Sequence, residues 1–523
     1  MPTMRRAVPW LVRHVTAAGA IASGVLFSSC DKSITDLEPL PPLAAASVDA
    51  AAGNWQMIVL TSANQVAVAA PAAVTSDAYK AEIAAVKVAQ ATLTSAQRAK
   101  IDYWAGGGVL RWNQVLRGLV AKYNLPPAPR ADGSYVFPDA NNPFGDPAFP
   151  FANPPYAARA YSYIAVAQYE ALKAAWFYKY QYNRAAPAKI DAGIQALMPV
   201  SDLPSYPSED AVLAGVTVAM LQTLFPAAVE EATLRGADQR EAAWLTGKAT
   251  SSDLAAGLAL GRSVATLVLA RMTTDGTGNA VGNATLWAAL ADGARARGET
   301  PWLSLEMPAR PPMLPAFGAV RTWSMTPVEL IAARPAAPYP TASPEMKAEV
   351  AEVRRTTEKL TREQRAIAQR WNDGAGTYTP PGHWNDIAAD HVRDAKFSEV
   401  RAARAFALLN MAMHDASVAC WEAKFTYFNP RPSQLDPAIR TDIGLPNFPA
   451  YPSGHSTFSA AASEVLGYLF PSESANFRVM ADEAGMSRLY GGIHYRLDID
   501  EGKAHGNRVA AYTLRFAQSD RAQ

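Results

Sequence analysis

The chain has 523 residues, of which 49% are apolar and 18% charged, and its formal net charge is +1. A chain of this length can hold two or three domains with a large core, and its balanced charge argues against a nucleic-acid-binding surface. Beyond the N-terminus no run of 18 residues is continuously apolar, so we do not expect the body to span a membrane.

Residues 1–30 are typical of an export signal. A basic start is followed by a short apolar stretch and by Ser28 and Ser29 directly before Cys30. Because this pattern resembles a bacterial lipoprotein signal, we expect an exported protein that is lipid-anchored in the cell envelope through Cys30. A plain secretory signal is the alternative. Residues 31–75 are interpreted as a tether, and with two cysteines in the chain disulfides contribute little.

Most of the remaining chain has apolar residues at a spacing of three to four, which predicts an all-α fold. We expect an N-terminal helical bundle over 76–300, a Pro-rich linker over 301–343 and a C-terminal helical bundle over 344–523. The predicted helices are 76–96, 97–122, 156–182, 208–225, 227–245, 252–271, 344–371, 396–422, 456–469, 474–490 and 499–517.

The two predicted bundles are related by an internal repeat. When the sequence is shifted by 245 residues, Trp176 aligns with Trp421, 206–208 with 451–453, and 224–226 with 469–471. One constant shift over this distance indicates two four-helix-type bundles that arose by duplication. Polar residues that occur only in the second copy are therefore the better candidates for function, and we expect no active site in the first copy.

Three motifs in the second copy carry those residues. They are Lys424-Phe-Thr-Tyr-Phe-Asn-Pro-Arg431-Pro432, then Pro452-Ser453-Gly454-His455, then Ser487-Arg488 followed by His494 and Asp498. Arginine forks and a lysine suit a tetrahedral oxyanion, and a glycine turn at the start of a helix adds free backbone N–H groups. We therefore expect Lys424, Arg431, Ser453, Gly454 and Arg488 to bind an oxyanion.

The two histidines of these motifs are assigned separate roles. Asp498 lies four residues after His494, so its carboxylate can select the tautomer that leaves the other ring nitrogen free to attack. His455 follows the glycine turn, where it can exchange a proton with the leaving oxygen and with water. His494, His455 and Asp498 are thus the candidate catalytic residues.

The three motifs resemble the signature of a known superfamily, which contains the type-2 phosphatidic acid phosphatases, the bacterial class A acid phosphatases and the vanadium-dependent haloperoxidases. Every signature position is matched from Lys424 to Asp498. The resemblance covers 345–517 directly, reaches residue 157 through the repeat and leaves residues 1–150 uncovered. It implies an all-α fold, with His494 as the nucleophile toward phosphorus or as the ligand of vanadium. Several further segments look most like soluble, haloperoxidase-like bacterial members.

From the sequence we rank hydrolysis of phosphate monoesters first, through a phosphohistidine and without a cofactor. The alternative is a vanadate-containing haloperoxidase that uses halide and hydrogen peroxide, because vanadate and phosphate share charge and shape. A lipoprotein that binds an oxyanion or a partner without turnover is the second alternative, and the set of His455, His494 and Asp498 argues against it. No membrane contact other than the anchor at Cys30 is expected.

Three nearby residues are weaker candidates for a supporting role. Asp415 could pair with Lys424 or Arg431, although a solvated helix face is the simpler interpretation. His383 could reach the rim of the pocket. Phe448 lies where some haloperoxidases place an aromatic side chain near the halide, and it could equally be a loop packing residue.

Overall fold

The computed structural model describes residues 40–124, 131–132, 153–199 and 201–522. The described parts contain helices and no β-strand, which confirms the all-α prediction. The predicted export signal, including Cys30, lies outside the described residues.

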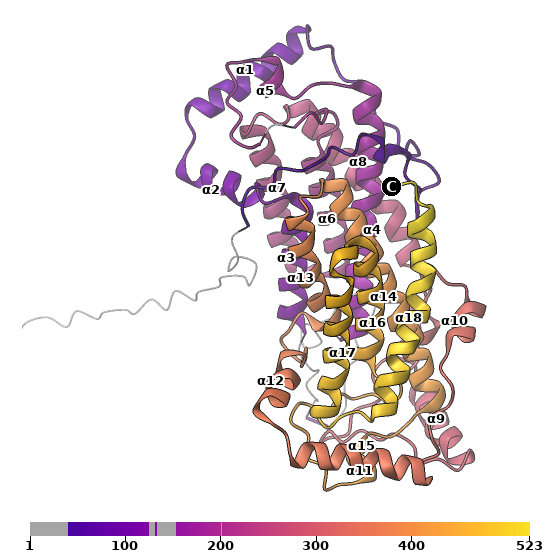
Figure 1. Cartoon of the computed structure of the whole chain (residues 1–523). Coiled ribbons are helices and arrows are strands. Elements are labelled where there is room, and N and C mark those ends of the chain that lie inside the picture. The colour runs from indigo at the N-terminus through magenta and orange to yellow at the C-terminus, as the bar shows by residue number, and fades with distance from the viewer. Residues whose placement is uncertain (1–39, 125–130, 133–152, 200, 523) are drawn as a thin grey trace, which may run out of the picture.

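Two bundles of long helices form the body of the molecule (Figure 1). Their two central helices, α4 and α14, pack against each other and join the bundles. The N-terminal bundle contains α4 (Pro154–Tyr182), α6 (Glu209–Leu224), α7 (Val229–Leu245) and α8 (Ser251–Met272). The C-terminal bundle contains α14 (Glu399–Tyr427), α16 (Gly454–Leu469), α17 (Ser474–Tyr490) and α18 (Arg496–Ser519). The shift of 245 residues relates α4, α6 and α7 to α14, α16 and α17, as well as the short helices α5 (Pro187–Ile190) and α15 (Pro432–Leu435).

The duplication extends further toward the N-terminus than the sequence comparison indicated. α1 (Asp77–Ala91), α2 (Ser95–Trp104) and α3 (Gly108–Tyr123) correspond to α11 (Pro344–Glu358), α12 (Arg362–Arg370) and α13 (Thr379–Asp394). α2 and α12 even begin with the same capping box, formed by Thr94 with Gln97 and by Thr361 with Gln364. Here the shift is 267 to 271 residues, so a search with one constant shift misses it. In Figure 1 α1 and α2 lie toward the end of the molecule opposite to α11 and α12, whereas α3 and α13 lie side by side.

The segment before each set of helices is a strap that lies along its bundle. In the N-terminal strap, defined as residues 43–69, the backbone N–H groups of Ile58, Val59 and Leu60 donate to the buried carboxylate of Glu170 at 2.9, 3.0 and 2.7 Å. Trp176 Nε1 donates to the carbonyl of Val48 at 2.8 Å. The prediction of a free tether is therefore wrong for the described part of 31–75, because these residues are held by buried hydrogen bonds.

A second strap, residues 308–336, repeats this arrangement on the C-terminal bundle. Trp421 Nε1 donates to the carbonyl of Met313 at 3.2 Å, as Trp176 does to Val48. Residues 301–343 were expected to be a linker, and this part of them packs as a strap. α9 (Ala284–Ala296) and α10 (Pro327–Ala333) are further helices that the periodicity did not indicate.

Helix boundaries differ from the predictions at glycines and prolines. The predicted helix 97–122 is divided by Gly106 and Gly107, and Gly107 has a φ of 98°. α13 was not predicted, because Pro380 and Pro381 resemble a helix breaker. They lie in its first turn, where proline is tolerated because the N–H groups there have no partner in the helix.

Glycines allow α8 and α18 to approach the neighbouring helix closely. A Cβ atom at Gly257, Gly261, Gly502 or Gly506 would lie only 2.3 to 2.8 Å from a carbonyl oxygen of α6, of α16 or of the residue that caps them. This contact holds the first turn of α18 against the N-terminus of α16. By length and composition alone, α8 is the one described helix that could cross a membrane.

Candidate active site

The three motifs meet at the N-terminus of α16, although they lie on different elements. Lys424 lies in the last turn of α14, Arg431 directly precedes α15, and Arg488 lies in the last turn of α17. His494 is in the connection between α17 and α18, and Asp498 lies in the first turn of α18. All five side chains are buried.

Ser453 and Gly454 form the start of α16. Ser453 is the N-cap, and its hydroxyl accepts a hydrogen bond from the N–H group of Ser456 at 3.3 Å. Its own N–H group donates to the carbonyl of Asp498 at 2.8 Å, which links α16 to α18. A Cβ atom on Gly454 would meet only ring carbons of Phe458 and Trp421, at 3.7 and 3.9 Å. Packing alone therefore does not require glycine here, and the space is available to a ligand at the helix N-terminus.

Lys424 is held by three carbonyl groups. Its ammonium donates to Pro449 and Ala450 at 2.9 and 2.8 Å, and also to Pro452. No carboxylate among the described residues forms an ion pair with it. Burial therefore lowers the pKa of Lys424 to about 8.

The two arginines are oriented mainly by oxygen atoms of the protein. Arg431 donates from Nε to the carbonyl of Phe448 at 3.0 Å and from Nη1 to that of Ile493 at 2.8 Å. Arg488 donates to the Ser487 hydroxyl at 2.8 Å and to carbonyl groups at the end of α12. Burial lowers the pKa of both guanidinium groups to about 10, and both stay charged at neutral pH.

His494 is held at both ring nitrogens. Nδ1 lies 2.8 Å from a carboxylate oxygen of Asp498, and Nε2 lies 2.9 Å from Nη1 of Arg431. Burial and the nearby cations lower the pKa of His494 well below its usual value, while burial raises that of Asp498. A neutral ring that donates from Nδ1 to Asp498 presents the Nε2 lone pair on the side of the arginine.

His455 faces a carboxylate that sequence analysis missed. Its Nε2 atom lies 3.6 Å from Asp373, whose other oxygen lies 3.1 Å from Nδ1 of His383. Burial and the charge of Arg488 lower the pKa of His455 to about 4. Although burial opposes ionisation, the contacts with both histidines hold the pKa of Asp373 well below its usual range. His383, which was predicted at the rim of the pocket, is thus linked to His455 through Asp373.

Of the other two weaker candidates, Phe448 lies beside the site and Asp415 does not contact it. The ring of Phe448 lies beside the site, with Lys424 Nζ at 5.1 Å and the guanidinium carbon of Arg431 at 5.0 Å from its centre. The predicted pairing of Asp415 with Lys424 or Arg431 is wrong. Its carboxylate accepts from the N–H groups of Trp323 and Ser324 in the second strap, at 2.7 and 2.8 Å. The reason is helical geometry, since nine residues correspond to about two and a half turns and place Asp415 and Lys424 on opposite faces.

Several buried polar atoms in this region have no hydrogen-bond partner. They are Nη2 of Arg431, Nε2 of His455 and the hydroxyl of Ser456. Buried polar groups are almost always satisfied in native proteins, and a tetrahedral oxyanion supplies acceptors for several donors at once. Together with the space at Gly454, this donor set fits a phosphate-sized anion.

The sequence pattern of the family described as PAP2 superfamily matches residues 403–521, which include every residue of the three motifs. This segment belongs to the PAP2 superfamily. Vanadium chloroperoxidase of Curvularia inaequalis is similar to the chain, with 36% identity over 101 residues. The match spans 16% of this chain and 16% of that protein, so it concerns a small part of either.

Solved structures of similar fold extend over much more of the chain. One is a bacterial vanadium-dependent iodoperoxidase with a TM-score of 0.51 and 23% identity, which covers 70% of this chain and 91% of that one. Another is a holo-type bacterial vanadium-dependent chloroperoxidase with a TM-score of 0.51 and 14% identity, which covers 71% and 93%. At these identities the likeness concerns the fold, and it includes both bundles. Residues 403–521 thus carry the PAP2 sequence pattern, and the chain resembles bacterial vanadium-dependent haloperoxidases in its fold.

Proposed function

We propose that this protein is a vanadate-dependent haloperoxidase, which converts halide, hydrogen peroxide and a proton into hypohalous acid and water. The observation that carries the proposal is the buried set of three cations around a neutral His494. The similarity of the motif region to a vanadium chloroperoxidase supports it, and for this reason we now prefer it to the phosphatase that we ranked first from the sequence.

In this proposal the side chains of Lys424, Arg431, Ser453 and Arg488, with the N–H group of Gly454, hold the vanadate oxygens. His494 ligates vanadium through Nε2, and Asp498 keeps that nitrogen unprotonated. Bound vanadate supplies a Lewis-acid centre that activates peroxide toward halide. His455 would exchange a proton with peroxide and with the departing oxygen, and Asp373, whose carboxylate lies 3.6 Å from its Nε2 atom, would orient its ring.

Phosphate-monoester hydrolysis is the second candidate, favoured by the unpartnered hydroxyl of Ser456 next to His455. His494 Nε2 would attack phosphorus and form an N–P bond. The P–O ester bond would break, and the leaving oxygen would take a proton from His455. Water activated by His455 would then hydrolyse the phosphohistidine and release phosphate.

One pair of assays separates the two candidates. The purified protein, with and without added orthovanadate, is tested for oxidation of bromide and iodide by hydrogen peroxide and for hydrolysis of a chromogenic phosphate ester. A haloperoxidase gains halide oxidation when vanadate is added. A phosphatase hydrolyses the ester and is inhibited by vanadate, and that outcome without halide oxidation would overturn our first choice.

The exported, lipid-anchored location is also a proposal. It rests on the residues before Cys30. Incorporation of a labelled fatty acid that is lost in Cys30→Ser would support it, and equal labelling of both proteins would contradict it.

A further inference from the structure

The N-terminal bundle contains a counterpart of the active-site pocket with altered residues. Lys179 corresponds to Lys424 and binds the carbonyl of Pro204, as Lys424 binds that of Pro449. Three functional residues of the second bundle, Arg431, Arg488 and His494, correspond to alanines in the first. These alanines are Ala186, Ala243 and Ala249.

The position of Gly454 is occupied by Glu209, the first residue of α6. Its buried carboxylate lies 2.8 Å from Nζ of Lys179 and 3.1 Å from Nζ of Lys248. Although burial opposes ionisation, the two lysines and the residue's own backbone N–H group hold the pKa of Glu209 well below its usual value. A carboxylate thus lies where the second bundle leaves space for an anion.

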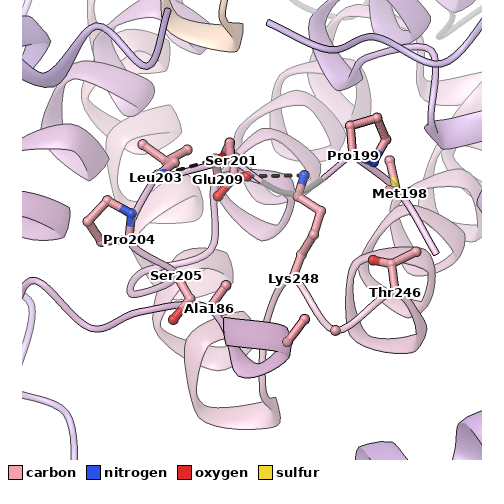
Figure 2. A pocket seen from close by; sticks show the side chains of 12 residues that line it. Ala186, Met198, Pro199, Ser201, Leu203, Pro204, Ser205, Glu209, Thr246 and Lys248 are labelled. Atoms are coloured by element: carbon pink, nitrogen blue, oxygen red, sulfur yellow. Dashed lines mark hydrogen bonds and ion pairs between the residues drawn. The ribbon is translucent and has the colours of Figure 1, made fainter. Parts of the chain in front are cut away.

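Lys248 has no charged counterpart in the second bundle, where Ile493 takes its place. It binds Glu209 on one side and Asp210 at 2.6 Å on the other. Figure 2 shows Glu209 and Lys248 facing each other across a small pocket that Ala186 also lines. Lys248 therefore supplies positive charge that the lost arginines no longer provide.

Glu209 and Lys248 also line a larger cavity of about 530 Å³, bounded by the N-terminal strap, Trp104 and Trp176, and lined as well by Asp202, Asp210 and Glu399. A cavity of this size admits a small ion. Trp104 corresponds to Trp371, the residue that precedes the Asn372-Asp373 turn beside His455. By this correspondence the cavity borders the N-terminal counterpart of the region around His455.

We propose that the N-terminal bundle holds a second oxyanion pocket in which the carboxylate of Glu209 takes the place of the anion. Removal of this carboxylate leaves Lys179, the N-terminus of α6 and Lys248, which stays paired with Asp210, around an empty space. An inorganic tetrahedral oxyanion of phosphate size then binds there. No reaction occurs, because Ala249 replaces the nucleophilic histidine.

The simpler interpretation is that Glu209 is only a helix-capping residue in a buried ion pair. The two interpretations differ for Glu209→Gly, which reproduces the residue of the second bundle. If Glu209 is only part of an ion pair, the Glu209→Gly variant should be less stable and should bind no additional oxyanion. If it occupies an oxyanion pocket, the variant should bind one additional phosphate.

The experiment counts bound phosphate per chain by equilibrium dialysis in the wild type, Glu209→Gly and Glu209→Gln. We expect one more phosphate in Glu209→Gly, and no gain in Glu209→Gln, whose amide fills the same space. Adding Lys248→Met to Glu209→Gly should remove the gain. Since the readout is the difference from wild type, it stays valid whatever the C-terminal site binds or catalyses.

Thermal unfolding with and without phosphate provides a second measurement. Phosphate should raise the melting temperature of Glu209→Gly more than that of the wild type. If the variant folds only in the presence of phosphate, this supports the proposal equally. A folded variant with no additional phosphate, or an unfolded one that phosphate does not restore, would overturn it.

Discussion

Asp498 binds the ring of His494 at 2.8 Å, whereas its counterpart Asp253 binds a guanidinium group, that of Arg184. Both aspartates cap the first turn of an equivalent helix, α18 or α8. The carboxylate is therefore part of the duplicated scaffold. Only the second bundle places an imidazole on it.

Replacement of His494 by alanine should reduce turnover by at least ~10³-fold, because the ligand or nucleophile is lost. Asp498→Asn should reduce it by roughly 10- to 100-fold, since the amide no longer fixes the tautomer. Steady-state kinetics check both, with circular dichroism to confirm folding. The matched control is Asp253→Asn, which should leave turnover per folded molecule unchanged. Wild-type turnover in His494→Ala would exclude its role.

Gly454→Glu should abolish oxyanion binding, because it places in the second bundle the carboxylate that occupies the first. A Cβ atom on Gly454 would meet only ring carbons at 3.7 and 3.9 Å, and in the first bundle the equivalent Lys179 pairs with Glu209 at 2.8 Å. The protein should stay folded, and vanadate titration should show no binding. Gly454→Ala is the control, and its smaller side chain should weaken binding without abolishing it. Undiminished vanadate binding in Gly454→Glu would show that the anion lies elsewhere.

Affinity for an oxyanion should fall as the pH rises above about 8, the lowered pKa of Lys424. A bound anion favours the charged lysine, so below this pH no proton is taken up and affinity is constant. Above it, binding requires a proton, and affinity decreases by up to about tenfold per pH unit. Calorimetric titration with sulfate, whose charge stays constant over this range, measures the effect. Lys424→Met should bind weakly with a flatter profile, and constant wild-type affinity up to pH 9.5 would contradict this assignment.

Asp373→Asn should lower turnover by roughly 10- to 100-fold, because His455 loses the carboxylate that orients it. The same change should lower the pKa of His455 further, because the Asp373 carboxylate favours the charged ring, so the pH–rate profile rather than KM should respond. His383→Ala, which removes the other histidine on Asp373, is the control and should have a smaller effect. Unchanged kinetics in Asp373→Asn would remove Asp373 from the site.

Asp415→Ala should lower stability and leave catalysis intact. The substitution leaves the N–H groups of Trp323 and Ser324 without their acceptor, which costs about 1–3 kcal/mol for each group that remains unsatisfied. Chemical denaturation measures the loss, and Asp415→Asn, which retains one acceptor oxygen, should lose less. A lower turnover per folded molecule in Asp415→Ala would indicate that Asp415 supports the active site after all.

The motif residues could be predicted from the sequence because their chemistry and spacing are both distinctive. Asp373 could not, because it lies in an Asn-Asp-Gly turn whose only sequence signal is a turn. The predicted contact of Asp415 was wrong because the prediction used its separation from Lys424 along the helix and not the helix face on which each residue lies. The first 150 residues showed no repeat because the shift changes between α3 and α4.

The contrast between Glu209 and Gly454 also affects how the two halves reach their final stability. The N-terminal bundle carries its own counterion, so nothing outside the chain is needed to neutralise its lysines. The C-terminal bundle buries Lys424, Arg431 and Arg488, and no carboxylate among the described residues forms an ion pair with them. We therefore expect a bound anion to contribute part of the stability of this bundle. Amide hydrogen exchange around 448–456 should therefore slow when vanadate or phosphate is added, while exchange around 203–211 should be unaffected.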